Sequence, residues 1–188
     1  MRITGGRYVR RQLKTPKQDI RPAMDRMRES VFAILGDIQD ESFLDLFSGS
    51  GSIGLEAASR GARPVTLVER DRRKRTYLEQ NASIAEEPIR IIITPVERFV
   101  KTASSPFDLI FLDPPFPYAH KQDLLERVAA SKLIHPAPRG NTLVLIHYPA
   151  EDDLADRIGC LAVVDERKYG RSMVRFYRSG STAEGDAL

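Results

Sequence analysis

The sequence predicts an α/β domain built on a mostly parallel sheet. Five apolar segments of strand type are each followed by a segment of helix type. Two further β-type segments close the chain and are joined by a tight turn. Alternation is typical of parallel strands with helices on both faces, and a closing pair adds an antiparallel hairpin. The length of 188 residues fits one domain with a short appendage.

The N-terminal part is predicted to be an arm followed by a helix. Residues 1–20 combine glycines and Pro16 with β-type residues, which favours a short hairpin or an extended arm. From Pro22 to Leu35 the apolar residues recur at helical spacing, and Gly36 ends the pattern. We therefore divide the chain into a basic arm (1–20), a main domain (21–178) and a disordered tail (179–188).

The other elements follow in order along the chain. Strands are expected at 43–47, 65–69, 89–93, 107–113 and 142–148, because these runs are apolar and rich in β-formers. Helices are expected at 52–60, 71–86, 96–102, 121–131 and 151–158. The closing hairpin is expected at 161–168 and 172–177.

Composition excludes several classes of protein. Hydrophobic residues make up 41% and charged residues 29%, as in ordinary globular domains. No apolar run is long enough for a membrane span, and no signal peptide is visible. One cysteine, Cys160, and three scattered histidines predict neither a disulfide nor a metal site. We expect a cytoplasmic protein without a membrane partner and, since no heptad pattern appears, a monomer.

Charge is concentrated near the N-terminus. The first 30 residues hold nine basic and three acidic groups, a net charge of +6, so the remaining 158 carry −3. A basic segment on a near-neutral body suggests a polyanionic partner. A solvated basic surface explains the same charge equally well.

A glycine-rich turn lies between the first strand and its helix. Residues 49–54 read Gly-Ser-Gly-Ser-Ile-Gly, and Glu69 follows Gly49 by twenty residues at the end of the next strand. The first glycine permits a tight turn, the second allows a ligand to approach the backbone, and the third allows close helix packing. A carboxylate at Glu69 can accept hydrogen bonds from ribose hydroxyls. The pattern predicts a nucleoside-binding half-site.

Two features favour a single nucleoside over a dinucleotide such as NAD. Asp45 lies four residues before Gly49, where a carboxylate would repel a pyrophosphate and suit a cation such as an amino acid's ammonium group. No second mononucleotide-binding half is evident after the fourth strand. The balance favours S-adenosylmethionine, while an NAD-dependent oxidoreductase stays open.

The fourth strand ends in Asp113-Pro114-Pro115-Phe116. Ligands of open α/β sheets bind outside the carboxyl ends of the strands, so Asp113 is expected at the ligand crevice. Prolines hold their carbonyls rigidly as acceptors, and Phe116 offers a flat apolar face. Acceptors beside an aromatic ring suit the exocyclic amine of a nucleobase lifted out of its stack. The tetrapeptide therefore predicts amine methylation by positioning and electrostatics.

These motifs resemble the RsmD-type 16S rRNA guanine-N2 methyltransferases of the class I S-adenosylmethionine-dependent superfamily. The resemblance covers about residues 1–178. It rests on Arg2-Ile3-Thr4-Gly5-Gly6, on Arg21-Pro22 with 25–29 and Phe32, on the cofactor motif at 44–51 with 54–57, and on the tetrapeptide at 113–116. It implies a Rossmann-like, seven-stranded sheet and methylation of a guanine in 16S rRNA, within the small ribosomal subunit or an assembly intermediate.

The resemblance also implies roles for individual residues. The cofactor set is Asp45, Phe47, Ser48, Gly49, Ser50, Gly51, Glu69, Arg70 and Val96. The tetrapeptide 113–116 would hold the guanine. Arg7, Arg10, Arg11, Lys14, Arg21, Arg26 and Arg28 would contact rRNA. This chain departs from the family pattern in three places. At Thr94-Pro95-Val96 only the Val96 N–H is left to bind the adenine. Ala23-Met24 stands where the family has two threonines, and Arg10 stands where the family commonly has glycine.

Three alternatives remain beside this interpretation. The same chemistry could act on adenine N6 or on a protein glutamine. An NAD-dependent oxidoreductase would share the glycine turn but lacks a convincing acid or base for hydride transfer. A non-enzymatic rRNA-binding assembly factor would keep the basic arm and be indifferent to Asp113→Ala.

Overall fold

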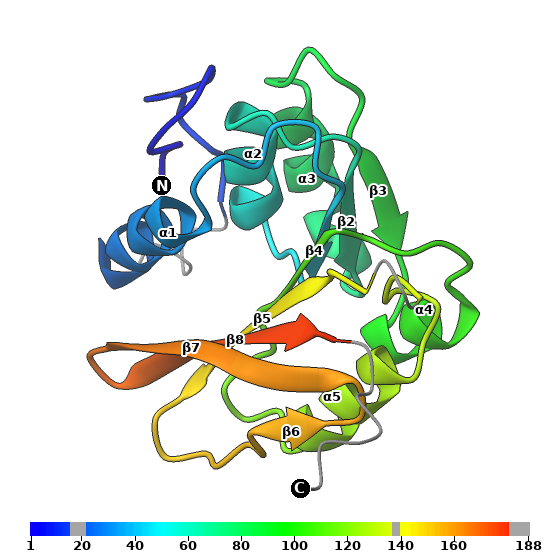
Figure 1. Ribbon diagram of the computed structural model, residues 1–188. Helices are drawn as coiled ribbons and strands as arrows, with labels where there is room; N and C mark the ends of the chain where they lie inside the picture. The colour runs from blue at the N-terminus through cyan, green and yellow to red at the C-terminus, as the bar shows by residue number, and fades with distance from the viewer. Residues whose placement is uncertain (16–21, 137–139, 181–188) are drawn as a thin grey trace, which may run out of the picture. The chain divides into compact units, whose positions relative to one another are not determined.

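The computed structural model describes residues 1–15, 22–136 and 140–180, which hold the eight strands and six helical segments of Figure 1. Contacts between residues divide the chain into two compact units, Met1–Val96 (unit 1) and Glu97–Leu188 (unit 2). The predicted boundaries at 20 and 178 do not coincide with this division, because the described part of the arm packs within unit 1.

Unit 1 is built on three parallel strands in the order β3–β2–β1. They are β1 (Phe43–Leu46), β2 (Val65–Glu69) and β3 (Arg90–Ile93). Its helical segments are α1 (Pro22–Leu35), α2 (Ser52–Ser59), η1 (Arg72–Lys74) and α3 (Arg75–Ala82). Every residue of β1 and β2 is buried, as expected for parallel strands.

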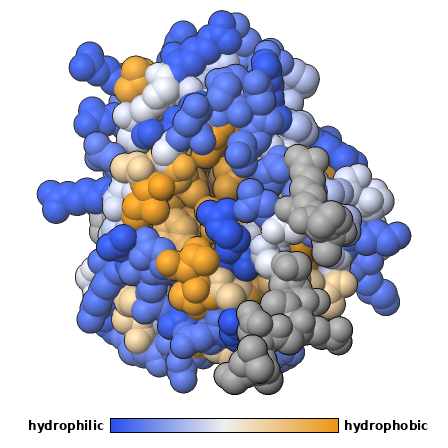
Figure 2. All heavy atoms as spheres, in the orientation of Figure 1, coloured by the Kyte–Doolittle hydropathy of each residue, from blue (hydrophilic) through white to orange (hydrophobic). Residues whose placement is uncertain are grey.

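The described part of the arm, residues 1–15, packs against α2 (Figure 1). Ile3, Tyr8 and Leu13 are buried in one cluster with Leu55. Arg2 forms an isolated antiparallel bridge with Gln12, so the predicted hairpin is reduced to one bridge with turns between. In the view of Figure 2, the upper part of the surface is mostly hydrophilic.

The buried Glu56 of α2 joins the arm to α1. Its carboxylate accepts hydrogen bonds from the backbone N–H groups of Thr4 and Gly5, each at 2.8 Å, and from the Thr4 hydroxyl. Arg28 Nε of α1 and Arg60 Nε bind the same carboxylate at 3.2 and 2.9 Å. One carboxylate therefore fastens three segments that are distant in sequence.

Unit 2 holds the other five strands in the order β4–β5–β8–β7–β6. They are β4 (Leu109–Leu112), β5 (Leu143–Pro149), β6 (Arg157–Ile158), β7 (Leu161–Tyr169) and β8 (Ser172–Ser179). β4 and β5 are parallel, and the later pairings are antiparallel. The helices are α4 (Val96–Thr102), which begins at the boundary, and α5 (Lys121–Ala129). The predicted α/β class with a closing hairpin is confirmed.

One predicted helix, 151–158, is wrong. The segment is mostly irregular and ends in the two-residue strand β6, an eighth strand beyond the seven expected. Its carbonyls bind side chains of β8: Arg175 donates to Leu154 O, and the Tyr177 hydroxyl donates to Ala155 O at 2.9 Å. These tertiary hydrogen bonds replace those that a helix would make.

The first residue of the predicted tail belongs to β8. Ser179 ends β8 and is buried, and residues 181–188 lie outside the described part of the chain. Among the helices that the structure describes, none has the length and apolar character needed to span a membrane.

Candidate functional site

The glycine turn between β1 and α2 is wound tightly by left-handed residues. Phe47, Gly49 and Gly51 have φ angles of 65°, 59° and 81°. Gly51 N–H donates to the Ser48 carbonyl at 2.7 Å, and Ser48 N–H donates to Val68 O of β2. The turn is therefore pinned to the neighbouring strand.

The three glycines of the turn differ in how close an added Cβ would come to other atoms. A Cβ on Gly54 would lie 2.2 Å from Leu67 Cδ2, so the third glycine permits helix packing, as predicted. A Cβ on Gly51 would lie 3.1 Å from side-chain atoms of Leu67 and Leu78, so this glycine also serves packing. At Gly49 the nearest atom would be 3.9 Å away. Gly49, rather than the predicted Gly51, is the glycine of this turn at which an added Cβ would make ordinary contacts only.

Two buried carboxylates brace the turn. Asp45 Oδ2 accepts from Gly54 N–H at 3.0 Å. Glu69 Oε2 accepts from Gly49 N–H at 2.9 Å and Oε1 from Asp71 N–H at 2.8 Å, and Lys74 Nζ lies 3.7 Å from Oε2. Each carboxylate oxygen can accept more than one hydrogen bond. Glu69 therefore anchors the turn and retains capacity to accept from a ligand.

The other predicted cofactor residues include both buried and exposed side chains. Ser48 and Ser50 are buried in the turn, and the Ser50 carbonyl accepts from Asn81 Nδ2 at 2.9 Å. Arg70 is exposed directly after β2. Val96 is buried at the first position of α4.

In unit 2, the tetrapeptide follows β4 directly. Leu112 pairs with Ile146 of β5, so the next residues, Asp113 and His147, lie side by side where β4 ends and β5 continues. Asp113 Oδ1 lies 2.8 Å from His147 Nδ1. The Phe116 ring packs edge-on against the His147 ring, with centroids 5.4 Å apart. Phe116 is 38% exposed and so presents apolar surface to solvent.

The loop after the tetrapeptide is fastened by Lys121. Its buried ammonium group donates to the carbonyls of Phe116 (2.9 Å) and Tyr118 (2.7 Å) and pairs with Asp152 at 2.6 Å. Tyr118 N–H donates to Pro115 O at 2.8 Å. The path of the loop is therefore fixed by hydrogen bonds at several points.

Tyr118 is fastened at its other end as well. Its hydroxyl donates to Glu97 Oε1 at 2.8 Å. Burial, together with this hydrogen bond, raises the pKa of Tyr118 to about 12, so the phenol keeps its proton and its contact to a higher pH than an ordinary tyrosine would.

Comparison with known proteins identifies the family. A family model described as "Conserved hypothetical protein 95" matches residues 1–178. The chain belongs to this family. Ribosomal RNA small subunit methyltransferase D of Escherichia coli (strain K12) is 31% identical over 190 residues, covering 100% of this chain and 94% of the relative. The protein of the same name from Haemophilus influenzae is 31% identical over 161 residues, covering 82% and 81%.

Solved structures agree with the family match. YhhF from Escherichia coli, a methyltransferase by its description, has a TM-score of 0.84 at 28% identity, covering 97% of this chain and 99% of that one. A protein from Thermus thermophilus has a TM-score of 0.78 at 29% identity, covering 94% and 98%. The resemblance to the RsmD-type family and the predicted fold class are both confirmed.

The residues expected to contact RNA fall into three groups. Exposed side chains belong to Arg7, Arg10, Arg11, Lys14 and Arg26. Arg10 has a left-handed φ of 69°, a conformation that glycine adopts without strain. Arg21 lies outside the described residues. The third group is Arg28 alone, which is buried.

Arg28 corrects the prediction. It was expected to contact rRNA, but it is 1% exposed and binds Glu56, Asp25 and the Arg2 carbonyl. A guanidinium group enclosed in this way holds the arm and is not accessible to a phosphate.

Sequence reasoning did not connect His147 or Lys121 with the tetrapeptide. The three histidines were predicted only not to form a metal site, and Lys121 only to begin a helix at 121–131. Their contacts depend on strand register and loop path. The one available signal was His147, a polar residue within an otherwise apolar strand, whereas Lys121 begins a polar stretch and gave no such signal.

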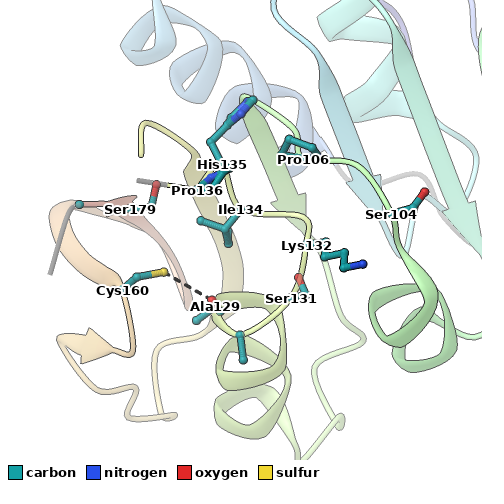
Figure 3. A pocket seen from close by; sticks show the side chains of 12 residues that line it. Ser104, Pro106, Ala129, Ser131, Lys132, Ile134, His135, Pro136, Cys160 and Ser179 are labelled. Atoms are coloured by element: carbon teal, nitrogen blue, oxygen red, sulfur yellow. Dashed lines mark hydrogen bonds between the residues drawn. The ribbon is translucent and has the colours of Figure 1, made fainter. Parts of the chain in front are cut away.

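A separate cavity of about 490 Å³ lies within unit 2 (Figure 3). It is lined by Ile134, His135, Cys160 and others, and by none of the predicted site residues. Cys160 Sγ donates to Ala129 O at 3.4 Å at its edge (Figure 3). Burial raises the pKa of Cys160, which favours a packing role over a nucleophilic one.

Proposed function

We propose that this chain transfers a methyl group from S-adenosylmethionine to the N2 amine of a guanine in 16S rRNA. The observation that carries the proposal is the full-length match to Ribosomal RNA small subunit methyltransferase D of Escherichia coli. That match spans the glycine turn of unit 1 and the tetrapeptide of unit 2.

Unit 1 is proposed to hold S-adenosylmethionine. The open backbone at Gly49 gives a ligand access, and Glu69 offers carboxylate oxygens to ribose hydroxyls. Asp45, Phe47, Ser48, Ser50, Gly51 and Arg70 complete the set, and the Val96 N–H is the proposed contact to the adenine. The polar donors and acceptors of this turn fit a nucleoside, since no pyrophosphate has to pass the carboxylate of Asp45.

Unit 2 is proposed to hold the guanine. Asp113 and the Pro114 carbonyl accept hydrogen bonds from the N2 amine, and Phe116 stacks on the extruded base. Two acceptors on one amine fix its two N–H bonds and so direct its lone pair. When bound, S-adenosylmethionine supplies an electrophilic methyl group and departs as S-adenosylhomocysteine. The N2 proton is lost to water after transfer.

The exposed basic side chains of the arm and α1 are proposed to contact the rRNA backbone. Arg7, Arg10, Arg11, Lys14 and Arg26 provide this surface, and Arg21 is assigned to it from the sequence. We further propose that a monomer acts in the cytoplasm on the small subunit or on an assembly intermediate.

The test is product identification. Purified protein is incubated with labelled S-adenosylmethionine and unmethylated small subunits, naked 16S rRNA or DNA, and the labelled nucleoside is identified after digestion. We expect N2-methylguanosine from the small subunit with wild-type protein and none with Asp113→Ala. Labelled adenine would overturn the substrate, and label on protein alone would overturn the nucleic-acid assignment. Equal labelling by Asp113→Ala would overturn the role of the tetrapeptide.

A further inference from the structure

His147 occupies a fixed place beside the tetrapeptide. It lies on β5, which pairs with β4 on one side and with β8 on the other, where His147 faces Val174. The imidazole is nearly enclosed, with 7% of its side chain exposed. A strand that is hydrogen-bonded to a neighbour on both sides has little freedom to move. The side chain of His147 is therefore held in one position next to the end of β4.

The hydrogen bond to Asp113 has a defined direction. A carboxylate can only accept, so Nδ1 of His147 carries the hydrogen and donates it to Oδ1. A hydrogen bond at 2.8 Å restricts rotation of the carboxyl group about its last bond. Oδ2 of Asp113 is then the oxygen left to meet a substrate amine.

The same ring also contacts Phe116. The two ring planes lie at 64° with centroids separated by 5.4 Å, an edge-to-face arrangement that favours one orientation of the phenyl group. His147 thus touches both the acceptor and the aromatic face that the proposed function assigns to the guanine.

We propose that His147 is a positioning residue: its Nδ1–H orients the Asp113 carboxylate and its ring edge orients Phe116, so that the guanine amine is held for transfer. This inference rests on the proposed function. It assigns no proton transfer to His147. Its expected effect is on turnover, because a misdirected acceptor costs rate even when the cofactor binds normally.

Substitutions at position 147 separate donor geometry from bulk. His147→Ala removes the donor and the ring. His147→Asn keeps an N–H donor the same number of bonds from Cα as Nδ1, and His147→Gln places it one bond further away. We expect kcat on small subunits to fall about 10- to 100-fold in His147→Ala. His147→Asn should recover part of this loss and His147→Gln less, with the Kd for S-adenosylmethionine unchanged by calorimetry.

Unit 2 contains a matched control. His135 Nε2 lies 2.9 Å from Asp108 Oδ1, directly before β4, and this pair is buried to a similar degree. Asp108 and Asp113 are five residues apart along a strand, roughly 16 Å at the rise of a β-strand. His135→Ala removes the same kind of contact away from the tetrapeptide. We expect its kcat to match wild type.

The outcomes separate the two proposals. Wild-type protein that methylates no rRNA would contradict the proposed function, and this inference with it. Active wild type with undiminished kcat in His147→Ala would contradict this inference alone. Equal losses in His147→Asn and His147→Ala, or in His135→Ala, would also contradict it, since a merely structural role predicts no dependence on donor position.

Discussion

Gly49 combines a left-handed backbone conformation with a place in the proposed cofactor site. Its φ is left-handed, and a Cβ there would make ordinary contacts only, at 3.9 Å from Phe47 O and 4.0 Å from Lys74 Nζ. We predict that Gly49→Ala destabilises the protein by about 1–2 kcal/mol through backbone strain. We also predict that it weakens S-adenosylmethionine binding by about tenfold, equivalent to ~1.4 kcal/mol. Urea denaturation and titration calorimetry measure the two effects.

Gly170 provides the control for this substitution. It has a φ of 63° in the β7–β8 turn, and a Cβ there would meet nothing within 4 Å. Gly170→Ala should therefore impose similar strain without changing cofactor affinity. Equal cofactor affinity in the two variants would remove Gly49 from the proposed binding site.

Some residue-scale properties could be predicted from sequence and others could not. Gly54 and Glu69 were found because their spacing from Gly49 is a local pattern, and both occupy the expected turn. The burial of Arg28 could not be found. It follows from Glu56, 28 positions away, whose charge requires a buried partner once α2 packs on the arm.

At the scale of elements, the loop between β4 and α5 depends on one lysine. Lys121 binds two loop carbonyls and Asp152. We predict that Lys121→Met, which keeps much of the apolar stem, lowers kcat/KM for rRNA about tenfold and stability by about 1–3 kcal/mol. The reason is that the Phe116 carbonyl loses the hydrogen bond from Lys121, and the Phe116 ring is then no longer held in one position. Methylation kinetics and urea denaturation give the measurements.

Lys132 offers the comparison within the same unit. Its side chain is exposed, so Lys132→Met should leave both kinetics and stability near wild type. Normal kcat/KM in Lys121→Met would show that the loop keeps its conformation without the ammonium group.

Element prediction succeeded where the signal is local. The apolar run 65–69 became β2 with the expected limits, and Gly36 ended α1 as expected. Segment 151–158 failed because its carbonyls bind Arg175 and Tyr177, which lie about twenty positions later. The residue pattern of this segment does not show that its backbone carbonyls accept hydrogen bonds from side chains of β8.

At the scale of the whole molecule, charge is separated along the chain. The arm and α1 carry the basic excess on a chain whose net charge is +3. We predict that replacing Arg10 and Arg11 together by glutamine weakens rRNA binding and lowers its salt slope by about 2, because each phosphate that is no longer neutralised removes about 1 from the slope. Binding measured over a range of salt concentrations gives this slope.

A replacement outside the arm serves as reference for the slope. Arg127→Gln removes an exposed charge from α5, and its slope should equal that of wild type. An unchanged slope in the Arg10 and Arg11 double variant would mean that these side chains stay solvated in the complex.

The shared carboxylate of Glu56 has a consequence for how sequences of this kind can change. Its partners come from the arm, from α1 and from Arg60 directly after α2, and a neutral residue at position 56 would leave Asp25 as the one carboxylate, among the described residues, that pairs with the enclosed guanidinium of Arg28. Loss of Arg28 alone would leave the buried carboxylate of Glu56 with Arg60 as its remaining cationic partner. Substitutions at positions 28 and 56 are therefore expected to occur together, because each single substitution removes a charge partner from a buried group.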